Sequence, residues 1–435
     1  MKRRAVLGAA VVVVLLVAGT AVLSARGAPE VPDKPTITMQ VWGSSIGHYT
    51  NAGIVFDLYP ELAERMELRV DVAGDHDADS ADAFRRRLAA GRDIPDIMYF
   101  NYTQIPEFAE AGVLHDIRDA VRPYEDQLVP TAMDLVMYED QYIAFPYELK
   151  SKIWYYRKDI FDEAGVNPDE VRTLEDFIAA GERIQELYPD KYIHNQGTDM
   201  IHYDLLMMLP VFNARYVDDD GRYIVDRDPG VRETFRFFKE LKDSDVVLGV
   251  MDWSPDWEAA FADGTLVSQL NASWFGLDVF LPTYAEGQEG LWAATTWPEA
   301  IAVGSDAGGS VYTIPAGAEN KELAMEFLQR MRFAVDANVR ISEERGVFPI
   351  IAEAQRQRLE TSAGDRFFAD DSFLTALERS FEYFAVFPFT PAASAEMPLV
   401  LAQLNRYIHG ELSLDEALQA TQRDLETQIG DPYEW

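Results

Sequence analysis

Apolar and polar positions in the first part of the chain follow the patterns of alternating strands and helices. Residues 36–42, TITMQVW, alternate in polarity and are rich in β-formers, so they predict a strand that ends at Gly43. The same reasoning predicts two more strands, at 67–72 and 94–100, and three helices, at 58–66, 80–91 and 103–112. Because strands and helices take turns along the chain, the pattern indicates a parallel sheet in an α/β fold.

The remainder of the chain is predicted to be mostly helical. Two further strands are expected at 266–271 and 309–315. Thr173 and Asp176 stand at the spacing of a capping box, which marks where one helix begins. Apolar residues at helical spacing predict helices at 159–164, 173–187, 202–209, 231–242, 257–261, 320–332, 355–359, 373–383, 398–409 and 414–429.

The stretch from Glu139 to Gly165 is rich in aromatic residues. Its aromatic side chains include Tyr142, Phe145, Tyr147, Trp154, Tyr155 and Tyr156. They show little helical periodicity, which predicts extended chain. Pro146 has no N–H to donate to a central ladder, so it marks an edge strand, a bulge or a crossing between two sheets. Flat aromatic faces beside hydrogen-bonding groups would suit a sugar ligand, and an aromatic core seam explains the same residues equally well.

The first 28 residues predict export. Lys2, Arg3 and Arg4 precede an uncharged, apolar run over 5–25, which is the pattern of a signal peptide. The run is also long enough to span a bilayer as an uncleaved anchor, and the basic residues would then hold the N-terminus in the cytoplasm. In both cases we expect the remainder of the chain to be exported, in the periplasm or otherwise outside the cytoplasm.

Composition narrows the class of protein. About 410 residues follow the signal, which are too many for one core and enough for two domains. The chain has no cysteine, which excludes disulfides, a lipid-modified cysteine and thiolate metal sites. Its net charge of −36 argues against nucleic acid and anionic membrane surfaces as partners. Such acidity is typical of proteins that stay soluble in high salt, and an acidic surface without adaptive meaning is the alternative.

Several short segments, each weak alone, occur in one order at ordinary spacing. They are Leu88–Asp96 (LAAGRDIPD), Ala111–Leu114 (AGVL), Tyr142–Tyr147 (YIAFPY), Asp159–Gly165 (DIFDEAG), Ala260–Gly264 (AFADG), Asn271–Phe275 (NASWF) and Leu412–Leu418 (LSLDEAL). Together they resemble an extracellular solute-binding protein of a bacterial ABC importer, of the carbohydrate type that includes maltose-binding protein. The resemblance runs from about Thr36 to the C-terminus.

The resemblance implies a fold, a function and a division of the chain. The fold is α/β, a two-lobed periplasmic-binding-protein fold of type II-like topology, with the ligand cleft between lobes joined by crossing strands. The first lobe would take 29–143 plus 303–347 and the second 148–298 plus 350–435. Hinges would lie near 144–147, 299–302 and 346–349 and would close on the ligand.

The implied function is capture of a mono- or oligosaccharide and its delivery to the permease subunits of an ABC importer. The protein would then be a monomer and not an enzyme, with no cofactor, no metal and no nucleic-acid partner. Two alternatives remain open. One is a secreted glycoside hydrolase or polysaccharide lyase, because acidic pairs are plentiful although no motif singles two of them out. The other is a binder of a non-sugar solute, such as a polyamine, a peptide or an anionic compound.

The expected ligand-binding residues end strands or flank the crossovers, since open α/β sheets bind ligands at the carboxyl ends of their strands. They are Trp42, Ser44, Tyr99, Asn101, Tyr147, Glu148, Trp253, Trp274, Phe275, Gly308 and Arg345. Trp274 is the strongest stacking candidate of the second lobe.

Several of these residues have a second explanation. Trp42 would stack on a sugar from the first lobe, with a core tryptophan as the alternative. Asn101 suits vicinal hydroxyls and equally suits a helix cap. Of Trp253 and Trp257, one is expected to reach the cleft and the other to lie in the core. Arg345 is expected to contact ligand or to hold the hinge.

Overall fold

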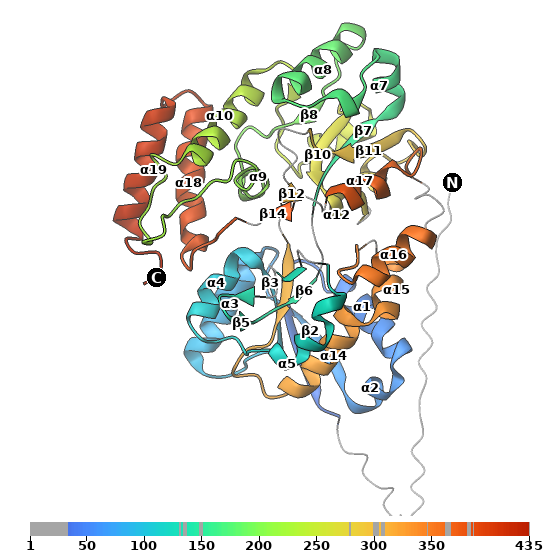
Figure 1. The fold of residues 1–435 in the computed structure, drawn as a ribbon, viewed down its shortest axis with the longest axis vertical. Helices are drawn as coiled ribbons and strands as arrows, with labels where there is room; N and C mark the ends of the chain where they lie inside the picture. The colour runs from blue at the N-terminus through green and yellow to red at the C-terminus, as the bar shows by residue number, and fades with distance from the viewer. Residues whose placement is uncertain are drawn as a thin grey trace, which may run out of the picture. The chain divides into compact units, whose positions relative to one another are not determined.

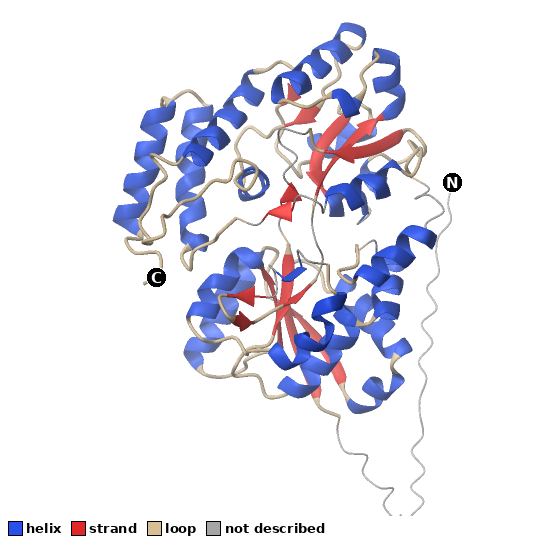
Figure 2. Ribbon diagram, in the orientation of Figure 1, coloured by secondary structure: helices blue, strands red, loops and turns tan. Residues whose placement is uncertain are grey.

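The computed structural model describes residues 34–434, apart from 130–131, 134–136, 148–150, 278–279, 299–303, 306–308, 346, 362–366, 381–383 and 386. The predicted export signal or anchor lies outside the described residues. Within them, strands and helices form two sheet-centred lobes, each with helices around its strands (Figures 1 and 2).

A five-stranded sheet forms the centre of the first lobe. Its order is β2-β1-β3-β13-β6. The strands are β1 (Thr36–Val41), β2 (Glu67–Val72), β3 (Ile97–Asn101), β13 (Ser310–Thr313) and β6 (Phe145–Pro146). β2 and β3 both pair with β1 in parallel, as the sequence predicts, whereas β13 runs antiparallel to its neighbours β3 and β6. The sheet is therefore mixed. Its strands β13 and β6 come from parts of the chain near the segments predicted to cross between the lobes.

The helices of the first lobe cover this sheet. They are α1 (Ile46–Leu58), α2 (Pro60–Arg65), α3 (Asp77–Ala90), α4 (Ile105–Glu110), α5 (Arg118–Val121), α14 (Lys321–Phe333), α15 (Val335–Arg345) and α16 (Ala352–Thr361), with 3-10 turns η1 (Tyr102–Gln104) and η2 (Arg122–Gln127). The single helix predicted at 58–66 is wrong in its bounds. Pro60 begins a second helix there, since proline is favoured in the first helical turn, and α1 precedes it.

The second lobe is built on a three-stranded antiparallel sheet of order β10-β7-β11. These strands are β10 (Ser268–Ala272), β7 (Lys152–Arg157) and β11 (Trp292–Thr296). Around them lie α7 (Lys158–Ala164), α8 (Leu174–Leu187), α9 (His202–Met208), α10 (Pro229–Asp243), α11 (Pro255–Ala262), α12 (Ser273–Leu277), α13 (Phe280–Tyr284), α17 (Ser372–Ser380), α18 (Ala393–Ile408), α19 (Leu414–Gln428) and the 3-10 turn η4 (Pro168–Glu170).

Three short strand pairs complete the list. They are β4 (Met137–Tyr138) with β5 (Gln141–Tyr142), β8 (His194–Asn195) with β9 (Val247–Leu248), and β12 (Gly304–Ser305) with β14 (Phe384–Ala385). The predicted capping box of α8 is confirmed: Asp176 donates its N–H to Thr173 Oγ1 at 3.1 Å, and the Asp176 carboxylate accepts from the Thr173 N–H at 3.1 Å. Its helix begins where the sequence places it.

The aromatic stretch joins the two sheets. Pro146 lies in β6, which is the edge strand of the first sheet, so one of the three roles predicted for it is confirmed. The chain then enters β7, where Trp154 and Tyr155 point to opposite faces and both are fully buried. Trp154 donates from Nε1 to Ser268 Oγ at 2.9 Å, and Tyr155 donates to the Ala272 carbonyl at 3.0 Å. Both faces of β7 are therefore covered by core, and these aromatics are structural.

The first-lobe core extends further along the chain than expected. Ile350, Ile351 and Ala354 belong to the cluster around the first sheet, which also contains Ile37, Phe100 and Phe327. The boundary predicted at residue 347 is therefore too early, because α16 packs beside α15 in the first lobe (Figure 1).

Candidate functional site

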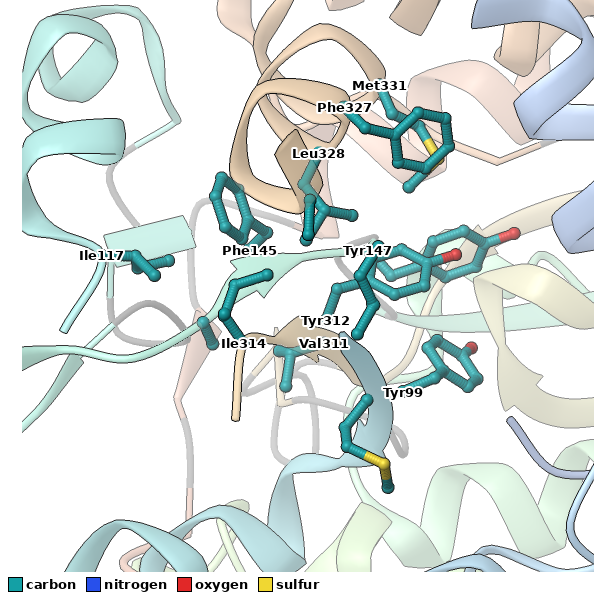
Figure 3. Close-up of a cluster of buried hydrophobic side chains, with 14 of the residues drawn as sticks. Tyr99, Ile117, Phe145, Tyr147, Val311, Tyr312, Ile314, Phe327, Leu328 and Met331 are labelled. Atoms are coloured by element: carbon teal, nitrogen blue, oxygen red, sulfur yellow. The ribbon is translucent and has the colours of Figure 1, made fainter. Parts of the chain in front are cut away.

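Three of the expected aromatics, Trp42, Tyr99 and Tyr147, lie together in the first lobe. The rings of Trp42 and Tyr99 stack with centroids 4.3 Å apart, and Tyr99 meets Tyr147 edge to face at 5.6 Å. Tyr312 of β13 completes this group, 5.1 Å from Tyr99, and Figure 3 shows Tyr99, Tyr147 and Tyr312 on the same side of the core cluster. Trp42 follows the carboxyl end of β1, which is the end where α/β sheets bind ligands.

A histidine and an arginine border this aromatic group. His48 in α1 is linked to Tyr312 by a hydrogen bond of 2.9 Å between Nδ1 and the hydroxyl oxygen. Burial, and then the charge of Arg345, lower the pKa of His48 to about 4, so the ring is neutral at pH 7. Arg345 at the end of α15 lies against Gly47, where an added Cβ would be 2.3 Å from its Nη2. Arg345 thus packs against the start of α1.

The tryptophans of the second lobe form a second aromatic group. Trp253 and Trp274 stack with centroids 5.5 Å apart, and Trp257 lies 4.8 Å from Trp253. Trp257 is buried, whereas Trp253 is 38 % exposed. Trp253 has φ of 64°, a conformation that is uncommon for a bulky residue and is found at ligand clamps. Phe275 is fully buried against Trp257 and Phe261, so it supports this group from behind.

A cavity of about 540 Å³ lies between the two lobes. The first lobe contributes Trp42, the segment 75–79, Thr103 and Gln104 to its lining. The second lobe contributes His202, Tyr203 and Leu206 of α9 and Ala393, Ser394, Met397, Pro398 and Leu401 of α18. The cavity thus combines aromatic faces with carboxylate, amide, imidazole and hydroxyl groups.

A smaller cavity of about 50 Å³ lies in the second lobe, and Tyr203 lines both cavities. Its polar and aromatic lining residues are His194, Asn195, Gln196, Tyr203, Asp204, Asp252, Trp253, Trp257, Gln269, Asn271, Trp274 and Trp297. Tyr203 follows His202 in α9, and the two rings lie 3.9 Å apart. One helix therefore presents side chains to both spaces.

Two partly buried carboxylates line the small cavity. Asp204 Oδ2 accepts from the Ile201 N–H at 2.7 Å, and Asp252 Oδ1 accepts from Asn195 Nδ2 at 2.7 Å. Burial, and then the nearby charge of Asp252, raise the pKa of Asp204 to about 8. Burial raises the pKa of Asp252 to about 6, against the opposing effect of its bond from Asn195. Such perturbed carboxylates in a cavity indicate a functional site.

The remaining expected residues have other surroundings. Ser44 is exposed and its Oγ accepts from the Ile46 N–H at 3.2 Å, at the start of α1. Asn101 is buried and its Oδ1 accepts from the Thr103 N–H at 3.2 Å, so it caps η1, which is the alternative considered for it. Glu148 and Gly308 lie outside the described residues.

Sequence reasoning missed Tyr203, Asp204, Asn195 and Gln196. An acidic residue three positions after a helix start is an ordinary capping signal, and Asp204 does cap α9. Because this capping role is common, the sequence gives no sign that Asp204 lies near Asp252. The segment 75–79, which lines the inter-lobe cavity, was missed as well.

The described residues hold no group of three or more His, Cys, Asp or Glu side chains arranged for a metal ion. No helix among them is long and apolar enough to cross a membrane.

Similar proteins fall into one class. Two similar curated proteins are the arabinooligosaccharide-binding protein of Bacillus subtilis (22 % identical, 60 % of this chain and 61 % of the relative) and the maltotriose-binding protein of Pyrococcus abyssi (22 %, 65 % and 60 %). The chain thus matches about three fifths of the length of these curated relatives.

Solved structures share the fold. An ABC transporter-associated binding protein from B. animalis subsp. lactis, in complex with beta-1,6-galactobiose, aligns with a TM-score of 0.74 at 20 % identity, covering 92 % of this chain and 99 % of that one. The galacto-N-biose/lacto-N-biose I-binding protein of Bifidobacterium longum, in complex with lacto-N-biose, gives 0.74 at 17 %, covering 92 % and 98 %. The predicted two-lobed α/β binding-protein fold is confirmed. Residues 62–369, more than two thirds of the chain, match the family described as bacterial extracellular solute-binding protein. This chain belongs to that family.

Proposed function

We propose that this protein captures a mono- or oligosaccharide between its two lobes and delivers it to the permease of an ABC importer. The observation that carries the proposal is the inter-lobe cavity, because about 540 Å³ is within the range of roughly 300–1,000 Å³ that ligand pockets occupy. Trp42 and Tyr203 bring flat faces to it, and Asp77, Thr103 and Gln104 bring hydrogen-bonding groups. Stacking faces with polar edges fit the C–H faces and hydroxyls of a sugar.

The similar proteins support the same class of ligand. Two of them are named for arabinooligosaccharides and maltotriose, and two were solved with beta-1,6-galactobiose and lacto-N-biose bound. Family membership places the protein outside the cytoplasm and makes it a binding protein rather than an enzyme. The first 28 residues would be removed as a signal or kept as an anchor. The hinges proposed near 144–147, 299–302 and 346–349 would close the lobes on the sugar.

Thermal shift with a panel of mono- and oligosaccharides tests the proposal. A sugar that binds should raise the melting temperature by mass action on the folded state. The sugar itself should remain chemically unchanged during hours of incubation with the protein. Trp42→Ala and Tyr203→Ala should weaken the response, while Tyr433→Ala, an exposed tyrosine outside the cavity, should leave it unchanged. Release of a cleaved product would refute the binding role. Stabilisation by polyamines and by no saccharide would favour the non-sugar alternative.

A further inference from the structure

The small cavity beside Tyr203 is too small for a sugar ring. Its volume of about 50 Å³ holds roughly three to five water-sized groups, since each needs about 10–15 Å³. Tyr203 also lines the inter-lobe cavity, so the two cavities adjoin at this side chain. The small cavity therefore suits the corner of a ring.

Two carboxylates and one amide oxygen supply hydrogen-bond acceptors to this cavity. Asp204 accepts a hydrogen bond from the Ile201 N–H, and Asp252 accepts from Asn195 Nδ2 and from the Gly197 N–H. Gln196 is 4 % exposed, donates from Nε2 to the Phe238 carbonyl at 2.8 Å, and leaves Oε1 without a partner among the described residues. One donor is also unpartnered there, Nε1 of Trp257, which is 1 % exposed. A complementary ligand group offers several N–H donors and one neighbouring oxygen.

We propose that this cavity binds the protonated amino group of an amino sugar together with the oxygen on the adjacent carbon. An ammonium has three donors and no acceptor, which matches Asp204, Asp252 and Gln196 Oε1. The adjacent hydroxyl oxygen would accept from Trp257 Nε1. Faces of Trp253 and Trp274 add cation–π attraction. Lysine and arginine do not occur among the residues that line the cavity. The inference rests on the proposed function, because it names the sugar class for the same site.

Protons compete with the amine for the same carboxylates. The pKa of Asp204, about 8, and of Asp252, about 6, mean that the empty pair holds a proton near neutral pH. An ammonium would displace that proton, so affinity for amino sugars should rise from pH 5 to pH 7 while affinity for neutral sugars stays flat.

Other titratable groups surround this pair on the neighbouring elements. They are His194 on β8, His202, Tyr203 and Asp77 at the inter-lobe cavity, Lys152 with Nζ 4.9 Å from the Trp297 ring, and Lys242 with Nζ 3.4 Å from the Gly197 carbonyl oxygen. Burial lowers the pKa of His194 to about 3 and that of Lys152 well below its usual value, so burial favours the neutral form of both. The competition is therefore assigned to the two carboxylates.

Calorimetric titration of the full chain at pH 7 tests the inference with matched sugars. The probes are glucosamine and galactosamine as monosaccharides and disaccharides, their N-acetylated forms, the corresponding neutral sugars, and spermidine as a cation without a ring. We expect at least one amino sugar to bind roughly 10-fold or more tightly than its neutral and N-acetylated counterparts, as charge-assisted hydrogen bonds allow. Equal or weaker binding of every amino sugar overturns the inference and leaves the proposed function standing if neutral sugars bind. Binding of spermidine alone overturns both.

Variants locate the effect in the cavity. Asp204→Asn and Asp252→Asn should each reduce the amino-sugar preference to about 3-fold or less, since the neutral amide keeps its shape and loses the charge. Asp228→Asn removes a buried carboxylate at the start of α10, outside the cavity, and should leave the preference unchanged. Two single variants are used so that the test still gives an answer if one of them does not fold. An unchanged preference in both folded variants would overturn the assignment.

Discussion

The ligand-free protein should become less stable as pH rises from about 4 to about 8, and Asp204→Asn should remove part of that loss. Asp204 has an ordinary pKa of 3.8 in the unfolded chain and about 8 in the folded one. Between these values the unfolded chain has released a proton that the folded chain keeps, so the free energy of unfolding falls as pH rises through that window. The loss is complete above the folded pKa.

The size of the effect follows from the same two values. At about 1.4 kcal/mol per pKa unit, the interval from 3.8 to about 8 gives an upper bound of roughly 6 kcal/mol. Asp252 accounts for part of this interval, and relaxation of the buried site reduces it further, so we expect roughly 2–4 kcal/mol. Asparagine cannot ionise, and its Oδ1 can still accept from the Ile201 N–H. The variant should therefore gain that amount relative to the unsubstituted chain between pH 5 and pH 8.

Urea unfolding at pH 5 and pH 8, at one ionic strength and without ligand, measures the difference. Asp176→Asn is the control, and it should change the free energy of unfolding in the opposite direction. Hydrogen bonds from the Arg172 and Thr173 N–H groups hold the pKa of Asp176 below its ordinary value, so its contribution is already present at pH 5 and persists at pH 8. That variant should lose stability at both pH values. An equal change in unfolding free energy at pH 5 and pH 8 for Asp204→Asn would refute the reasoning.

Three further predictions concern the site, the core and the surface. Trp274→Ala should weaken saccharide binding by about 1–3 kcal/mol in calorimetry, by analogy with other stacking contacts, and unchanged affinity would remove it from the site. Phe275→Ala should instead lower the free energy of unfolding by about 3–5 kcal/mol, because it empties a fully buried volume; a loss below about 1 kcal/mol would contradict its placement in the core. Raising NaCl from 0.05 to 1 M should increase the melting temperature, because salt screens repulsion within a chain of net charge −36. A melting temperature that falls with salt would oppose this.

Local signals determined much of the fold. The strand at 67–72 and the beginning of α8 at Thr173 follow from residue alternation and from a side chain that caps its own helix. Pro146 predicted an edge strand, a bulge or a crossing between sheets, because its missing N–H excludes it from a central ladder, and the structure places it in the edge strand β6. Such signals depend on neighbours in the sequence, so the sequence alone is sufficient to read them.

The candidate site depended on contacts that local signals do not encode. Trp42, Trp253 and Trp274 could be proposed from their places at strand ends or beside turns, whereas the pairing of Asp204 with Asp252 could not. Each carboxylate has an ordinary local explanation, and their raised pKa values arise only because folding brings both to one water-poor cavity. Burial of Trp154 likewise required both faces of β7 to be covered by segments distant in the sequence. The sequence by itself determined the elements and the family, and the tertiary structure alone decided which acids and aromatics share a cavity, because burial and charge coupling belong to segments that meet only in the folded chain.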